Sequence, residues 1–213
     1  MNSRDRVLDR VRRALGDAPR ETASYAQDVP RDYAEQHGTL TTAETADLLA
    51  ENLADYRALV HRTQEAELPA LIARLLTERA AACVLVPPGL PKEWLSATAT
   101  PLVEDSADST PHALDEVSAV VTGCALAIAE TGTIVLDGSP DQGRRRITLI
   151  PDHHICVVRV PEQLVSSVPQ ALPRLNPRKP LTWISGPSAT SDIELDRVEG
   201  VHGPRTLQVI LVE

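Results

Sequence analysis

The chain has 213 residues, of which 42% are hydrophobic and 24% are charged, and its formal net charge is −9. This length accommodates one α/β domain with a small appendage and is too short for two full domains. The negative charge argues against nucleic-acid binding, because a phosphate backbone is recognised by a clustered basic face, and against attraction to an anionic membrane surface.

The cellular setting is predicted from three further features. The longest uncharged stretch in the middle of the chain, residues 117–129, is shorter than the roughly 20 apolar residues of a membrane-spanning helix, and the charged N-terminus lacks the apolar segment of a secretory signal. Cys83, Cys124 and Cys156 are widely separated, which favours buried thiols over a metal or iron–sulfur site. We therefore expect a cytoplasmic protein with no membrane span and no metal or redox cofactor on this chain.

The first 38 residues are predicted to form a helix and an arm. Apolar residues recur at helical spacing from Val7 to Leu15, basic residues occupy the opposite face, and Gly16 follows as a stop signal. Residues 17–38 have weak periodicity. The predicted domains are therefore residues 1–38, an N-terminal helix and arm, and residues 39–213, an α/β domain.

Helices are expected at several places in the second region. Thr41 and Glu44 have the spacing of a capping box, and apolar residues follow at helical spacing as far as Tyr56 and Val60. Further helices are expected around residues 68–76, near residues 91–96, and after Pro161, because proline is favoured in the first helical turn.

Short apolar runs predict the strands. They cover residues 83–86, 119–122, 126–129, 133–136, 155–160, 181–184 and 207–212. The third and fourth runs are separated by a three-residue turn containing glycine, which indicates a hairpin. Strands that alternate with helices indicate an α/β fold with a mostly parallel sheet, an antiparallel hairpin and a helical N-terminal arm.

The turn of the predicted hairpin is the first candidate functional segment. It contains Glu130, Thr131 and Gly132. A carboxylate at a strand end beside a glycine turn is well placed to act as a nucleophile, a base or a hydrogen-bond acceptor. The alternative interpretation is a surface hairpin with solvated side chains.

A second candidate segment follows the strand predicted at residues 181–184. Its Gly186 turn leads to Ser188, Thr190 and Asp192, so that hydroxyls and free backbone N–H groups are available to cradle an anion. In the alternative interpretation these polar residues only cap a short helix.

The third candidate segment is a loop in which His202 stands beside Gly203. His202 either hydrogen-bonds a carboxylate ligand or has a structural role. The adjacent His153 and His154 point to opposite faces of a strand, so no metal site is expected there. The basic cluster at residues 144–146 either holds an acidic partner or balances nearby carboxylates.

These three segments are predicted to converge on one pocket for a small anion, because loops at the carboxyl ends of strands in open α/β sheets meet at a crevice. In that pocket the N–H groups near Ser188, the hydroxyl of Thr190 and the His202 ring would hold a carboxylate, while Asp192 caps a helix. Glu130 would repel an anion unless it is protonated or points away. It is therefore also a candidate for binding a partner chain or a substrate hydroxyl.

The same three segments, in this order and together with the first helix, resemble the lactate-utilisation (LUD) domain family and, within it, the C-type proteins. The segments are residues 129–133, 185–194 and 200–204. The resemblance covers nearly the whole chain, although residues 17–118 match only in general pattern.

The resemblance implies a Rossmann-like fold similar to the ribose-phosphate isomerase and CoA-transferase superfamily. It also implies a non-redox subunit of a complex that oxidises L-lactate to pyruvate, with the iron–sulfur clusters on separately encoded partner proteins. An alternative is an independent CoA-transferase-like or cyclo-ligase-like enzyme that uses Glu130 on a small anionic substrate. Thr131 stands where the transferases have asparagine, and the second half of a transferase is missing.

Overall fold

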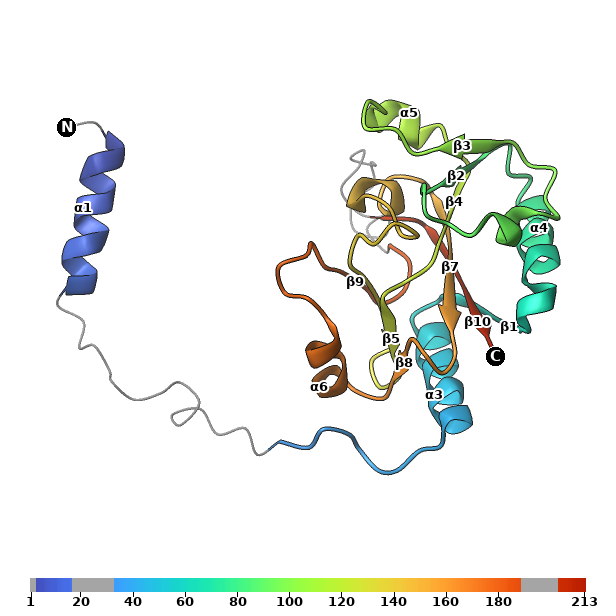
Figure 1. Cartoon of the computed structure of the whole chain (residues 1–213), viewed down its shortest axis with the longest axis horizontal. Helices are drawn as coiled ribbons and strands as arrows, with labels where there is room; N and C mark the ends of the chain where they lie inside the picture. Colours follow the sequence, from blue (N-terminus) through green and yellow to red (C-terminus); the bar gives the residue numbers. More distant parts are fainter. Residues whose placement is uncertain (1–2, 17–32, 189–202) are drawn as a thin grey trace. The chain divides into compact units, whose positions relative to one another are not determined.

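The computed structural model describes residues 3–16, 33–188 and 203–213, and the chain divides into two compact units, residues 1–33 and 34–213 (Figure 1). The first unit contains α1 (Ser3–Gly16). None of the α1 residues is buried within the unit, and Val7, Val11 and Leu15 are exposed. Asp5 in its first turn and Arg13 in its last turn match the helix dipole.

The second unit is organised around a six-stranded sheet in which every neighbouring pair of strands is parallel. The order is β1 (Leu59–Thr63), β10 (Thr206–Val212), β7 (His153–Arg159), β4 (Ala119–Thr122), β2 (Val84–Val86) and β3 (Leu102–Glu104). All residues of β4 and β2 are buried, as expected for parallel strands covered on both faces. The predicted α/β class with a mostly parallel sheet is confirmed.

Four further strands of the described residues form a second sheet, and none of them pairs with a strand of the first sheet. Its order is β8 (Leu164–Val165), β5 (Leu126–Ile128), β6 (Thr133–Leu136) and β9 (Thr182–Ile184). The β5–β6 pair is the predicted antiparallel hairpin, β9 joins β6 antiparallel, and β8 joins β5 parallel.

The helices cover the sheets. The α-helices of the second unit are α3 (Thr42–Asp55), α4 (Leu68–Glu78), α5 (Pro111–Asp115) and α6 (Val168–Ala171). Short 3₁₀ turns occupy Glu65–Glu67, Lys92–Leu95, Arg145–Thr148 and Leu172–Arg174. Among the described helices, none has the length and apolar character that crossing a membrane requires.

The start of α3 carries the predicted capping box. The Thr41 hydroxyl accepts a hydrogen bond from the Glu44 backbone N–H at 3.3 Å, and the Glu44 carboxylate accepts one from the Thr41 backbone N–H at 2.8 Å. The hydrogen bond that the Glu44 carboxylate accepts from the Thr41 backbone N–H, and next the one that it accepts from the Thr41 hydroxyl, lower the pKa of Glu44. Two N–H groups at the helix terminus are thereby satisfied.

The core is divided between the two faces of the parallel sheet. On β7, Ile155 and Val157 pack with the apolar side of α4, whereas Cys156 and Val158 pack with α3 and with the inner face of the second sheet. The side chains alternate because successive residues of a strand point to opposite faces. The far face of the second sheet is covered by Ala171 of α6. The second sheet is therefore held between the parallel sheet with α3 on one side and α6 on the other.

Two sequence expectations differ from the structure. Val60 was expected to continue the helix of Tyr56, but α3 ends at Asp55, Arg57 takes a positive φ of 67°, and Val60 belongs to β1. The chain after Pro161 forms a turn and then β8, not a helix. The Gln163 side chain holds that turn by accepting the N–H of Arg159 at 2.8 Å, which leaves the following residues free to pair with β5.

Candidate functional site

The Glu130 turn is fixed by backbone hydrogen bonds on both sides. The N–H groups of Ala129 and Glu130 donate to the carbonyls of Val165 and Ser166, each at 2.9 Å, which continues the pairing of β5 with β8. Gly132 closes the turn with φ 54° and donates to the carbonyl of Ala129 at 3.2 Å. The carboxylate is therefore projected from a rigid backbone at the end of β5.

Both oxygens of the Glu130 carboxylate are bound by one residue. The backbone N–H of His37 donates to Oε1 at 3.1 Å, and His37 Nδ1 lies 3.2 Å from Oε2. The Glu130 side chain is 22% exposed, whereas that of His37 is 82% exposed. Glu130 is thus a partly covered hydrogen-bond acceptor, and the residue that covers it lies at the surface.

The segment that contains His37 is attached to the turn that precedes α6. The Ser167 hydroxyl donates to the carbonyl of Glu35, and the Gln170 side chain lies 2.8 Å from that of Gln36. Residues 35–37, which we call the N-terminal strap, are therefore anchored at three consecutive positions across the end of β5.

The end of α3 presses against two of the predicted glycines. A Cβ on Gly132 would lie 2.8 Å from the backbone carbon of Asn52, and a Cβ on Gly186 would lie 2.4 Å from the carbonyl oxygen of Tyr56. Gly186 also has φ 84°, a conformation that side chains other than glycine rarely adopt. The Asn52 amide donates to the carbonyl of Ala129 at 2.8 Å, so α3 holds the Glu130 turn by a hydrogen bond as well as by packing.

A chain of hydroxyl groups joins the first two predicted segments. The Thr131 hydroxyl donates to that of Thr133 at 2.8 Å, and Thr133 Oγ1 lies 2.8 Å from Ser185 Oγ. Ser185 follows β9, which pairs with β6. The Glu130 turn and the Gly186 turn therefore meet at the same end of the second sheet.

The second and third predicted segments also meet. The backbone N–H of Ser188 donates to the carbonyl of Pro204 at 2.8 Å, and Gly203 precedes this contact with φ 80°. Thr190, Asp192 and His202 lie outside the described residues. The contacts between the three segments run through the second sheet and the start of β10, and not along the carboxyl edge of the parallel sheet as the sequence argument assumed.

The two adjacent histidines have separate structural partners. His154 Nε2 lies 2.8 Å from the Thr122 hydroxyl, and His153 Nε2 lies 2.7 Å from the side-chain oxygen of Gln208. Burial lowers the pKa of His154 to about 3 and also lowers the pKa of His153. Both rings are therefore neutral near pH 7, and they face opposite sides of β7. Within the described ranges, no group of three or more His, Cys, Asp or Glu side chains is placed to hold a metal ion.

Several residues of this region were not identified from the sequence as functional. His37 lies 93 positions before Glu130, and no local pattern indicates that the two meet. Asn52 lies on an ordinary amphipathic helix. Thr133 and Ser185 fall within the candidate segments, and the Ser-Gly-Pro turn was the signal that could have singled out Ser185.

Comparison with known proteins gives consistent results. The model of the LUD domain family matches residues 46–212. A lactate utilization protein C from Deinococcus radiodurans is 44% identical over 211 residues, covering 97% of this chain and 93% of that protein. A lactate utilization protein C from Bacillus subtilis is 35% identical over 134 residues, covering 58% of this chain and 55% of that protein.

A solved structure is also similar to this chain. It is the crystal structure of a DUF162 family protein from Deinococcus radiodurans, with a TM-score of 0.69 and 41% sequence identity. The similarity covers 82% of this chain and 100% of that one. Together with the match of the family model over most of the chain, these relatives show that the chain belongs to the LUD domain family.

Proposed function

We propose that this protein takes part in lactate utilisation as a non-redox subunit that acts with iron–sulfur partner proteins to convert L-lactate to pyruvate. The observation that carries the proposal is the 44% identity to a lactate utilization protein C over nearly the full length of both chains. A shared name over a partial match would be weaker support, because the remaining part of the relative could carry the activity.

The cysteines support the assignment of the clusters to partner proteins. Cys124 and Cys156 are buried, and Cys83, which directly precedes β2, is partly buried. The pKa of the Cys124 thiol is raised well above its ordinary value. The first cause is a hydrogen bond with the Cys156 side chain, and the second is burial. A thiol held in its neutral form is a poor metal ligand, because thiolates bind metals.

Within such a complex, the region around the Glu130 turn is the proposed contact for a small carboxylate ligand or a partner chain. Ser188 and Gly203 lie beside the part of the chain outside the described residues, which includes Thr190, Asp192 and His202. The alternative, an independent enzyme with Glu130 as a nucleophile, requires the N-terminal strap to leave, since His37 binds both carboxylate oxygens.

The experiment is deletion of the gene in its host followed by growth on L-lactate as the sole carbon source. We expect growth on L-lactate to be lost, growth on pyruvate to be retained, and affinity purification of the tagged chain from lactate-grown cells to recover proteins that contain iron–sulfur clusters. Normal growth of the deletion strain on L-lactate contradicts the lactate role. Recovery of the chain alone, with growth still lost, contradicts only the partner assignment and favours the independent enzyme.

A further inference from the structure

The strongest unassigned feature of the molecule is a cavity of about 500 Å³ at the carboxyl edge of the parallel sheet. Its lining includes Pro88, which follows β2, Asp105, which follows β3, and Pro180, which precedes β9. Gly138 and Gly143 form part of the remaining wall. The volume is within the range of sites that bind small molecules, and this edge is where open α/β sheets place their ligands.

The cavity exists because residues 137–146, which we call the crossing segment, run across the ends of two parallel strands. The N–H of Gly89 donates to the carbonyl of Pro140 at 3.0 Å, and the N–H of Gly123 donates to the carbonyl of Asp141 at 3.1 Å. Gly89 follows β2 and Gly123 follows β4. A Cβ on Gly89 would lie 2.4 Å from Pro140 Cβ, so the segment is closely packed against the sheet.

The walls are braced by ion pairs and charge-assisted hydrogen bonds. Arg144 Nε donates to Asp105 at 2.7 Å, and its guanidinium also binds the carbonyl of Ser106. The Asp105 side chain is only 4% exposed. The neighbouring Arg146 donates to the carbonyl of Ser109. Arg144 and Arg146, on either side of Arg145, therefore fasten residues 105–109 to the crossing segment.

The opposite wall is braced in the same way. Lys179 Nζ lies 2.6 Å from Asp137 Oδ2 and 3.2 Å from the Ser139 hydroxyl. The charge of Lys179 is thereby offset by Asp137, as that of Arg144 is by Asp105.

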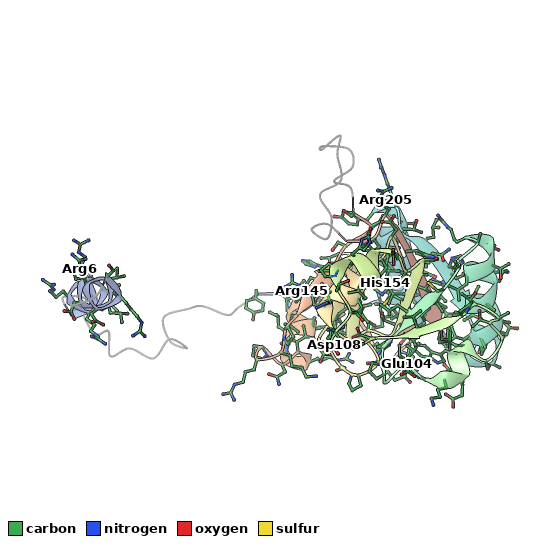
Figure 2. The ribbon with its side chains drawn as sticks, turned by 90° about the horizontal axis from the view of Figure 1, so that it is seen from above. Arg6, Glu104, Asp108, Arg145, His154 and Arg205 are labelled. Atoms are coloured by element: carbon green, nitrogen blue, oxygen red, sulfur yellow. The ribbon has the colours of Figure 1, made fainter. Side chains whose placement is uncertain are left out.

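Arg145 differs from these three cations. Its side chain lines the cavity and is exposed, and within the described part of the chain it has no hydrogen bond or ion pair (Figure 2). It also borders a second cavity of about 360 Å³ together with Leu149 and Ile150. Among the described residues, Arg145 thus supplies a positive charge with no paired carboxylate to a cavity whose other cation, Arg144, is paired with Asp105.

We propose that this cavity binds an organic anion larger than lactate, whose carboxylate or phosphate group pairs with Arg145 and whose apolar or planar part packs against Pro88, Pro140 and Pro180. A guanidinium presents two parallel N–H donors to such an oxyanion. Lactate itself would fill only a small part of 500 Å³, so it leaves most of the proline surface in contact with water. The site is separate from the Glu130 turn, since the two regions lie at opposite ends of β6.

The test uses the full chain and 8-anilinonaphthalene-1-sulfonate, a fluorescent probe with one anionic group and an apolar body. We expect one saturable site, with affinity reduced at least about tenfold in Arg145→Ala and by less in Arg145→Lys. Ala107→Trp places a large side chain on an exposed part of the cavity wall, and it is expected to abolish binding without a change of charge. The matched control is Arg79→Ala, which removes an exposed arginine after α4, at the opposite edge of the sheet.

Circular dichroism and thermal melting of each variant confirm that it is folded. Equal probe affinity in the wild type and Arg145→Ala, or full binding to Ala107→Trp, overturns the proposal. Displacement of the probe by AMP or by octanoate supports it and identifies the anionic group, and displacement by neither overturns it. Displacement by L-lactate at the same concentration contradicts the proposed ligand size. None of these outcomes depends on the role in lactate utilisation.

Discussion

The carbonyl oxygen of Tyr56 lies 2.4 Å from the position that a Cβ on Gly186 would occupy. The end of α3 and the turn after β9 are therefore in contact through backbone atoms, with no space for a side chain. This contact positions the Ser185–Gly186 turn beside the Glu130 turn, and its tolerance of a methyl group can be measured.

Gly186→Ala is expected to lower the free energy of unfolding by about 2–4 kcal/mol, because the new methyl group meets backbone and φ 84° is unfavourable for alanine. Gly38→Ala is the matched control, since Gly38 has φ 76° and open space around its Cβ position. It should cost only about 1–2 kcal/mol. Urea unfolding of both variants measures the difference, and equal losses would show that the contact with Tyr56 relaxes freely.

Removal of the His37–Glu130 interaction should release the N-terminal strap. In Glu130→Gln and in His37→Ala we expect faster amide hydrogen exchange at residues 35–37. Unfolding stability should change by less than about 1 kcal/mol, because the His37 side of the pair is 82% exposed to solvent. His112→Ala is the control, since His112 is equally exposed and pairs with Glu116 within α5 and its C-cap. Unchanged exchange at residues 35–37 in both variants would mean that Ser167 and Gln170 hold the strap unaided.

The buried His154 predicts a loss of stability in weakly acidic solution. Its pKa is about 3 in the folded chain, against 6.5 for an ordinary exposed histidine. As the pH falls below 6.5, the unfolded chain therefore binds a proton that the folded chain does not. Stability should decrease by up to about 1.4 kcal/mol per pH unit between pH 6.5 and 3. His61 and His153 have pKa values lowered by burial and act in the same direction.

The measurement is the free energy of unfolding between pH 5 and 7. Glu44 titrates below this range, because the backbone hydrogen bond from Thr41 lowers its pKa from the ordinary value of 4.5. His154→Gln, which retains a polar group beside Thr122, should flatten the pH dependence, whereas His112→Gln should leave it unchanged. A slope that persists in His154→Gln would assign the effect to the other two histidines.

The hydroxyl chain should couple Thr133 to Ser185. Thr133→Val is expected to cost about 1–2 kcal/mol of stability, because it removes the hydrogen bond to Ser185 and leaves the Thr131 hydroxyl without its acceptor. A double-mutant cycle with Ser185→Ala should give a coupling energy of about 1 kcal/mol. Additive effects of the two substitutions would show that the 2.8 Å contact contributes nothing to stability.

Local patterns in the sequence predicted the local parts of the fold. The capping box of Thr41 and Glu44, the hairpin around Gly132 and the apolar central strands all depend on residues close together in the chain, and all are found. The strand β3 was missed because all three of its residues are exposed, so its sequence has no buried face to reveal. Val60 was assigned to a helix because its spacing fits one, whereas Arg57 ends that helix by its conformation.

The site was less predictable because its contacts are distant in sequence. The division of the strands into two sheets depends on pairings such as that of β8 with β5, which no short pattern encodes. His37 reaches Glu130 across 93 positions, and the Arg145 cavity is assembled from segments that follow β2 and β3 and precede β9. The sequence places Gly132 and Gly186 in turns, and both have a positive φ there, but only the structure shows that the end of α3 is their neighbour.

The match to the family model begins at residue 46, whereas the N-terminal strap that binds Glu130 ends before it. The part of the chain that matches the family and the residues that bind the Glu130 carboxylate are therefore encoded in different parts of the sequence. Two proteins with identical LUD domains but different sequences before residue 46 would present different chemistry at this position, one with a bound carboxylate and one with an open carboxylate. Functional differences within such a family can therefore arise from the residues that precede the domain, without any substitution in the domain itself.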